Sequence, residues 1–249
     1  MQILAVTNIK GGVGKTTTAV NLAFFAAGSG MRTVLWDLDP QGAATWLLRG
    51  EPDDRISAKK LVRGRQDLQE ILSATEHEDL HLVPADTSYR NIDIHMSERK
   101  HPTERLMRMS RSLEEACDLL VLDCPPGMSL LSENVLRAAD ALVVPMVPAP
   151  LSLRMLDELL LFVERTGWRD LRLLAFFSMV DRRKLLHGET MTHARIRFPS
   201  ILATEVPYWS EIERMSVRRA PIAAYAPHSA AARIYESLWA EVSGRLAAA

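Results

Sequence analysis

A glycine-rich run with two lysines lies near the start of the chain, and its residue types are those that bind phosphate. The stretch 10–17 reads KGGVGKTT and lies between an apolar segment and a segment with helical periodicity. Glycines allow several backbone N–H groups to converge on one anion, and the first turn of a helix adds the positive end of its dipole. The loop therefore predicts a site for the phosphates of a nucleotide.

The residues of this loop have distinct expected roles. Lys15 is expected to pair with the β- and γ-phosphates, and the hydroxyl of Thr16 is expected to bind Mg²⁺. The usual pattern begins with a glycine, and Ile9 stands in its place here. An ordinary glycine-rich helix start is the alternative, but the match is long and agrees in residue type. The residues expected to contact the nucleotide are Gly11, Gly12, Val13, Gly14, Lys15, Thr16 and Thr17.

Lys10 needs a separate explanation, because two like charges at one phosphate group repel each other unless the anion lies between them. Lys10 could instead reach the nucleotide of a second subunit. It would there stabilise the charge that develops during phosphoryl transfer, as an arginine finger does. Taken alone, Lys10 would be interpreted as a solvated surface lysine, but its position beside this loop favours the catalytic role.

Aspartates end two of the apolar stretches. Asp37 and Asp39 belong to VLWDLDPQG, and Asp123 ends LLVLD. Runs that are apolar throughout are typical of strands buried on both faces of a parallel sheet, and ligands bind at the carboxyl ends of such strands. Asp123 is expected to hold Mg²⁺ through a water molecule, because this ion keeps much of its hydration shell. Asp37 is expected to support the Mg²⁺ site or the loop without binding the metal directly. Cys124 is expected to be a small buried residue.

The stretch 10–17 resembles the deviant Walker A motif of the ParA/MinD class of ATPases, and the segments around Asp39 and Asp123 resemble the acidic motifs of that class. The resemblance implies a dimer that sandwiches two nucleotides, with Lys10 crossing to the ATP of the partner. It also implies that Asp39 orients the attacking water. The catalytic residues expected on this basis are Lys10, Lys15 and Asp39.

Within that class the chain resembles the small ParA/Soj-like partitioning and cargo-positioning members, because no helix-turn-helix segment precedes its first expected strand. Members of this kind dimerise with ATP and Mg²⁺, bind nonspecific DNA as dimers, and move a plasmid, a chromosome or a protein assembly such as a carboxysome or chemotaxis cluster. A ParB-like partner or cargo adaptor stimulates their hydrolysis. The resemblance further implies that Met179 and Pro207 contact the adenine base.

DNA contacts are expected from the basic residues Arg183, Arg214, Arg218 and Arg219, of which Arg183 matches a DNA-contacting arginine of chromosomal relatives. Glu211, however, stands where an arginine would help to bind DNA. The alternative is a regulatory or assembly ATPase of the same family, as in secretion or cellulose synthesis, that acts on a protein or membrane partner without DNA. A third possibility is a ligase that acts on a cobalamin precursor, although such enzymes usually carry a further domain for which this chain has no room.

The elements that must position these residues alternate along the chain. This alternation predicts an α/β fold with a doubly wound, mostly parallel sheet flanked by helices. The expected strands are 3–7, 33–37, 80–84, 119–123, 141–145, 171–178 and 201–206. The expected helices are 16–27, 87–96, 103–116, 129–139, 152–166, 185–197 and 229–246. The polar segment 49–79 is assigned to no element.

Composition bounds these expectations. The chain has 249 residues, 47% of them hydrophobic, which fits a single ParA-like domain over 1–249. Its net charge of −1 means that any basic surface is local. Two cysteines are too few for a disulfide framework, and their arrangement does not suit an iron–sulfur cluster. No apolar run approaches the roughly 18 residues that span a bilayer. We therefore expect a cytoplasmic protein without membrane insertion, associated with the nucleoid when it is ATP-bound.

Overall fold

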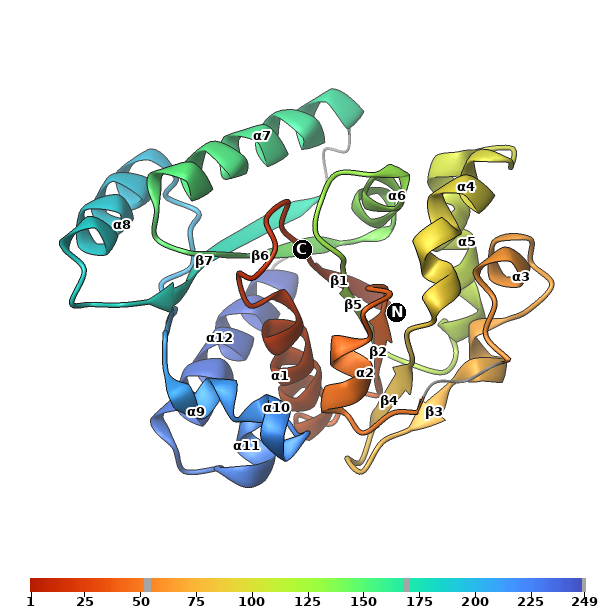
Figure 1. Ribbon diagram of the computed structural model, residues 1–249, viewed down its shortest axis with the longest axis horizontal. Helices are drawn as coiled ribbons and strands as arrows, with labels where there is room; N and C mark the ends of the chain where they lie inside the picture. The colour runs from red at the N-terminus through yellow and green to blue at the C-terminus, as the bar shows by residue number, and fades with distance from the viewer. Residues whose placement is uncertain (52–54, 168–170, 248–249) are drawn as a thin grey trace.

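The computed structural model describes residues 1–51, 55–167 and 171–247. They form an eight-stranded sheet between two layers of helices (Figure 1). The strands are β1 (Gln2–Val6), β2 (Thr33–Asp37), β3 (Ser73–Ala74), β4 (Leu80–Val83), β5 (Leu119–Asp123), β6 (Ala141–Met146), β7 (Arg172–Val180) and β8 (Glu205–Pro207). Their order is β3-β4-β2-β5-β1-β6-β7-β8, and every neighbouring pair is parallel except β3 with β4.

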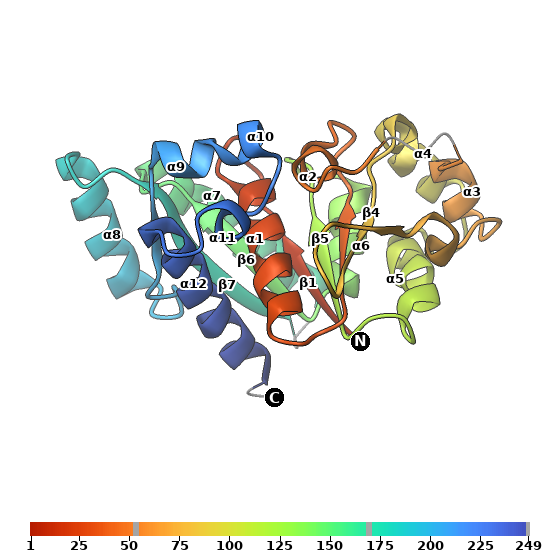
Figure 2. The same ribbon diagram turned by 90° about the horizontal axis from the view of Figure 1, so that it is seen from below.

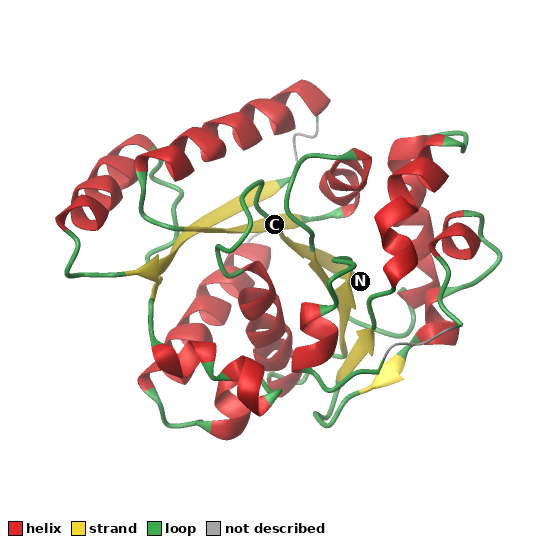
Figure 3. Cartoon of the chain, viewed as in Figure 1, coloured by secondary structure: helices red, strands yellow, loops and turns green. Residues whose placement is uncertain are grey.

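Helices cover both faces of the sheet (Figure 3). They are α1 (Lys15–Gly28), α2 (Ala43–Leu47), α3 (Ala58–Val62), α4 (Ile92–Ser97), α5 (Arg105–Ser110), α6 (Leu130–Ala138), α7 (Pro150–Thr166), α8 (Leu185–Arg197), α9 (Ser210–Glu213), α10 (Met215–Arg218), α11 (Ile222–Tyr225) and α12 (Ala230–Ala247). Apolar residues of α3–α8 pack on one face, and those of α1, α2 and α10–α12 pack on the other. Figure 2 shows α1 and α12 on the same side of the sheet, where they contact each other.

The central strands are buried on both faces, as their continuous apolar sequences predict. In β1, Ile3 and Ala5 belong to one core and Leu4 and Val6 to the other, because successive side chains of a strand point to opposite faces. Burying a Val, Leu or Ile side chain contributes about 1.5–3 kcal/mol to stability. The sheet that holds the loops is therefore fixed by packing on both sides.

The last expected strand, 201–206, is wrong over its first four residues. Leu202 N donates to Ala175 O, but the next two backbone N–H groups donate to the carboxylate of Glu241 on α12. This side chain replaces the neighbouring strand as hydrogen-bond acceptor, so the chain enters the sheet only at β8, over Glu205–Pro207.

Two expected helices are shorter and less regular than their periodicity predicts. The helix expected over 87–96 starts as a 3₁₀ helix at Thr87–Asn91 and continues as α4. The helix expected over 103–116 is divided into a 3₁₀ turn at Pro102–Glu104, α5, and a second 3₁₀ turn at Arg111–Leu113. Within the unassigned stretch 49–79 the structure contains α3, a 3₁₀ helix at Leu68–Ile71 and β3.

Candidate nucleotide-binding site

The phosphate loop connects the end of β1 to the start of α1, so its glycines lie at the carboxyl edge of the sheet. Gly12 has a φ of 70° and Gly14 a φ of 88°, a left-handed conformation that glycine adopts without steric cost. A Cβ atom at Gly14 would also lie 3.0 Å from the hydroxyl oxygen of Ser178. The loop thus needs glycine at these positions, and it presents backbone where ligands bind in such sheets.

The two lysines of the loop have different surroundings. Lys15 is buried, and its Nζ donates to the backbone oxygen of Lys10 at 3.3 Å. Burial lowers the pKa of Lys15, and the charge of Asp123 acts in the opposite direction. The side chain of Lys10, by contrast, is exposed. Only Lys15 is therefore placed inside the loop of its own subunit.

Asn8, which the sequence analysis did not single out, fixes the start of the loop. Its Nδ2 donates to the backbone oxygen of Pro145 in β6 at 2.8 Å, and its Oδ1 accepts a hydrogen bond from Lys10 N at 2.9 Å. The side chain thus ties the backbone of Lys10 to the strand beside β1. An asparagine after a strand carries no specific signal in a single sequence, so this role was visible only in the structure.

Asp37 and Asp123 end neighbouring strands and are direct partners in the register of β2 and β5. The carboxylate of Asp37 accepts hydrogen bonds from Thr45 N and Thr45 Oγ1, both at 2.8 Å, and from Asp39 N at 3.2 Å. Burial raises its pKa to about 6. Burial and the charge of Asp37 raise the pKa of Asp123 well above its usual range, while the Thr16 hydroxyl and Lys15 act in the opposite direction.

The acid pair fits a divalent cation. Both carboxylate oxygens of Asp123 are buried and lack a well-formed hydrogen bond within the described residues. A buried carboxylate in this condition is costly unless a cation compensates it. The described residues contain no group of three or more His, Cys, Asp or Glu side chains that could hold a metal ion. Mg²⁺ does not need one, because phosphate, water and the Thr16 hydroxyl can complete its shell.

Thr45 positions Asp37, and we expect Thr45→Val to lower the free energy of unfolding by about 1–3 kcal/mol. The Thr45 hydroxyl donates to Asp37 and accepts from Ala85 N at 2.8 Å, so valine leaves both buried groups short of a partner. Chemical denaturation of the nucleotide-free protein measures the change. The control Thr45→Ser keeps the hydroxyl and should lose less than about 1.5 kcal/mol. Equal stability of the valine variant and the wild type would contradict this role.

Most of the predicted nucleotide contacts meet in one cavity of about 340 Å³ at the loop. Its lining contains two of the three predicted catalytic residues, Lys15 and Asp39, and it reaches Met179. The lining residues are Gly11, Gly12, Gly14, Lys15, Thr16, Thr17, Asp39, Pro126 and Met179. Val13 is buried beneath the loop, and the exposed Lys10 does not line this cavity.

A second, mainly apolar cavity of about 160 Å³ adjoins the first and contains both residues expected to contact adenine, Met179 and Pro207. Met179 lines both cavities and has a φ of 55°, a strained conformation for a residue with a side chain. The other walls of this cavity were not predicted from the sequence. They include Leu47, Tyr208, Trp209, Met215 and Tyr235.

The four arginines expected to contact DNA have unequal surroundings. Arg183 makes a bidentate pair with Asp181, with both N–O distances 2.9 Å. Arg214 and Arg218 are exposed, and their side chains have no hydrogen bond or ion pair in the part of the chain that the structure describes. Arg219 is partly buried and is held by contacts to α2. Two of the four side chains are thus already engaged within the molecule.

We call the contacts of Arg219 with α2 the Trp46–Arg219 clasp. The guanidinium carbon of Arg219 lies 3.9 Å from the centre of the Trp46 ring, and Arg219 Nε donates to Trp46 O at 3.1 Å. Trp46 Nε1 donates in turn to Ser216 O at 3.3 Å. Arg49 adds hydrogen bonds to the backbone oxygens of Arg218 and Arg219. The clasp joins α2, which follows Asp39, to α10, which lines the second cavity.

The loop, the acid pair and the parallel sheet define a P-loop nucleotide-binding protein. A family model described as "AAA domain" matches residues 1–170. The chain is 32% identical over 248 residues to the sporulation initiation inhibitor protein Soj of Bacillus subtilis, which covers 97% of this chain and 98% of that protein. The chain belongs to the ParA/Soj/MinD family of ATPases, as its motifs predict.

Solved structures share the whole fold. Cobyrinic acid a,c-diamide synthase of Mycobacterium smegmatis, with bound ADP and magnesium, has a TM-score of 0.84 at 25% identity and covers 99% of this chain and 96% of that chain. The apo McdA of Cyanothece has a TM-score of 0.84 at 17% identity, with 99% of both chains covered. The predicted α/β fold is confirmed. The mycobacterial chain, 96% of which is covered, is an exception to the expectation that ligases of cobalamin precursors usually carry a further domain.

Within the described residues, no helix combines the length and the apolar character that crossing a membrane requires.

Proposed function

We propose that the protein is a dimerisation switch driven by ATP and Mg²⁺. The observation that carries this proposal is the arrangement at one edge of the sheet: a buried Lys15, an unpartnered carboxylate at Asp123 and an exposed Lys10. ATP would lie with its phosphates on the loop 11–17 and its base between Met179 and Pro207. The two adjoining cavities support this placement. The first is lined by residues of the phosphate loop, the second is lined by Met179 and Pro207, and Met179 lines both.

The chain's own residues divide the catalytic work. Bound Mg²⁺, held by Thr16 and through water by Asp123, would neutralise phosphate charge. Lys15 binds the transferred phosphoryl group, and Asp39 orients the attacking water from the wall of the same cavity. Lys10 of the partner subunit adds positive charge as the transition state forms. Asp37 keeps Asp39 N and Thr45 in place behind this site.

In this proposal the ATP-bound dimer binds nonspecific DNA, and a ParB-like protein or cargo adaptor stimulates hydrolysis and so releases it. The protein would be cytoplasmic and associated with the nucleoid while ATP is bound. Similarity to the partitioning proteins over nearly the full chain supports this function. Arg214 and Arg218 are free to contact phosphate, whereas Arg183 would have to exchange Asp181 for it and Arg219 would have to leave the clasp.

One observation favours the rival function, an assembly ATPase that acts on a protein and never on DNA. Leu185 and Ile196 of α8 are 78% and 76% exposed. Large apolar side chains at the surface are typical of protein interaction sites when they gather in a patch. Glu211 beside the base cavity adds to this argument, because it repels phosphate at the position where an arginine was expected.

Gel shifts separate the two functions. The Asp39→Ala variant with ATP and Mg²⁺ is mixed with a nonspecific duplex at two salt concentrations. We expect a dimer that retards the duplex, and less retardation at the higher salt because phosphate contacts release counterions. A dimer that retards no duplex at either salt concentration would favour the rival function. A protein that remains monomeric with ATP would overturn the switch itself.

A further inference from the structure

Basic residues are frequent in and beside α3–α5. These helices lie apart from α8–α10, in or next to which the arginines expected to contact DNA are found (Figure 1). The segments 58–66 and 90–111 contain ten Lys and Arg residues and three Asp and Glu residues, in a chain whose net charge is −1. Such an excess produces a local positive field even though the whole protein is nearly neutral.

Contacts between the helices bring these charges together. α3 packs against both α4 and α5. The guanidinium of Arg105 on α5 donates to Val62 O at the end of α3 at 2.6 Å, and Arg63 pairs with Glu98 after α4 at 3.3 Å. We call the following six side chains the α3–α4 basic cluster: Lys59, Lys60, Arg63, Arg65, Arg99 and Lys100.

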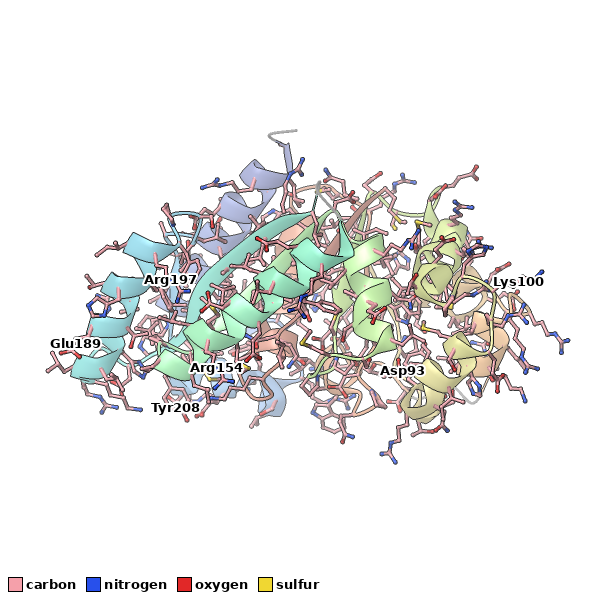
Figure 4. All side chains as sticks on the ribbon, turned by 90° about the horizontal axis from the view of Figure 1, so that it is seen from above. Asp93, Lys100, Arg154, Glu189, Arg197 and Tyr208 are labelled. Atoms are coloured by element: carbon pink, nitrogen blue, oxygen red, sulfur yellow. The ribbon has the colours of Figure 1, made fainter. Side chains whose placement is uncertain are left out.

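The cluster is largely unneutralised. Arg63 pairs with Glu98, but the other five members are exposed and have no side-chain hydrogen bond or ion pair among the described residues. The opposite end of the molecule differs, because four arginines there are paired with carboxylates. These pairs are Arg182–Glu205, Arg183–Asp181, Arg195–Glu205 and Arg197–Asp157. Figure 4 shows Lys100 at the far end of the molecule from Glu189 and Tyr208.

Arg105, at the base of the cluster, shows that positive charge is crowded there. Its Nε is buried and has no partner in the described part of the chain. Burial lowers its pKa, and the charges of Arg108 and Arg99 lower it further. Like charges held close together repel each other, so an anion bound at this surface would relieve the repulsion.

We propose that the α3–α4 basic cluster binds the phosphate backbone of nucleic acid and supplies more of the phosphate contacts than the arginines between 182 and 219. This inference rests on the proposed function, for which it names the DNA-binding surface. A protein partner would need an apolar centre, and an anionic membrane would need an apolar helix face. Among the exposed large hydrophobic residues, only Ile94 lies on these segments of the described chain. Exposed, unpaired lysines and arginines are instead the side chains that make sequence-independent phosphate contacts.

Two matched neutralising variants test the proposal, each in the Asp39→Ala protein with ATP and Mg²⁺. The cluster variant carries Lys59→Gln, Lys60→Gln, Arg99→Gln and Lys100→Gln. The control carries Arg182→Gln, Arg183→Gln, Arg214→Gln and Arg218→Gln. Fluorescence anisotropy measures the Kd for a nonspecific duplex over a range of salt concentrations. The cluster variant should bind on the order of 10–100-fold more weakly at about 0.1 M salt. Its salt slope should be smaller by about 3–4 for each subunit whose cluster contacts the duplex, because each lost phosphate contact removes about 0.9 from the slope.

The control variant should lose less affinity than the cluster variant, and both should dimerise and bind ATP like the parent. A charge-preserving variant with Lys59→Arg, Lys60→Arg and Lys100→Arg should retain DNA binding, which distinguishes charge from folding. If the control variant loses more affinity for the duplex than the cluster variant, or if neither variant loses affinity, the cluster is not the DNA-binding surface, although the proposed function stands. If the parent dimerises but binds no duplex, the DNA-binding function is overturned together with the cluster's role.

Discussion

Replacing Lys10 with alanine is expected to slow ATP hydrolysis by about 10³-fold and to change ATP affinity by no more than a few-fold. An arginine finger contributes about 10³–10⁵ to phosphoryl transfer, and Lys10 would act in the same way from the partner subunit. Affinity should persist because Lys15, not Lys10, lies in the loop of its own subunit. Single-turnover hydrolysis and the titration of a fluorescent ATP analogue measure the two quantities separately.

A mixing experiment shows whether Lys10 acts across the interface. Lys10→Ala lacks the crossing lysine, and Asp39→Ala lacks the residue that orients water, so each protein alone should be inactive. In a mixed dimer, the Asp39→Ala subunit supplies Lys10 to the intact site of its partner. An equal mixture should therefore recover about a quarter of wild-type hydrolysis, because about half of the C2 dimers are mixed and each has one complete site. No recovery, or an active Lys10→Ala protein, would contradict the crossing lysine.

The second large effect is expected for Asp39→Ala, which should lower hydrolysis by about 10²–10⁴-fold, the range of a positioned base or water-orienting group. Asp39 lines the phosphate cavity, and its Oδ1 accepts one hydrogen bond from Gln41 N at 3.0 Å. ATP binding should survive, because Lys15 and the glycines are untouched. Light scattering with ATP and Mg²⁺ should then show a dimer that persists for longer than the wild-type dimer.

Asp39→Asn is the matched control for this change. Asparagine can still accept the hydrogen bond from Gln41 N, so the loop keeps its shape while the negative charge is lost. We expect hydrolysis to be as low as in the alanine variant. An asparagine variant that hydrolyses ATP at the wild-type rate would show that the Asp39 charge is not needed for the chemical step.

The fold was largely predictable because its signals are local. Continuous apolar runs identify strands that are buried on both faces, and the glycine loop identifies the carboxyl edge where ligands bind. The error at the last strand occurred where a distant side chain replaced a regular backbone hydrogen bond. Glu241, on the last helix, accepts the hydrogen bonds that a longer strand at 201–206 would have made to its neighbour. The sequence around residue 201 gives no signal that the side chain of Glu241 contacts this segment.

The candidate site divides in the same way. Lys15, Thr16, Asp37 and Asp123 belong to motifs whose residue types indicate their chemistry. In the structure Asp37 and Asp123 end adjacent strands, and Lys15 and Thr16 at the start of α1 lie close enough to Asp123 to affect its pKa. The residues that hold them were not predictable, because their roles depend on contacts between separate segments. Thr45 is such a residue, since its hydroxyl joins Asp37 to Ala85 N across two loops. A single sequence records the type of such a residue but not its partner.

The Trp46–Arg219 clasp connects α10, which lines the apolar cavity, to α2, which follows Asp39, so the proposed base site and the proposed water-orienting residue are linked mechanically. α10 contributes Met215 and Ser216 to the base cavity, and α2 begins directly after the Asp39 turn. Because the clasp ties these helices together, a ligand that fills the apolar cavity would also restrain Asp39 in the proposed mechanism. An anion that fills only the cavity at the glycine loop touches no residue of α10, so in the proposed mechanism it would lack this restraint.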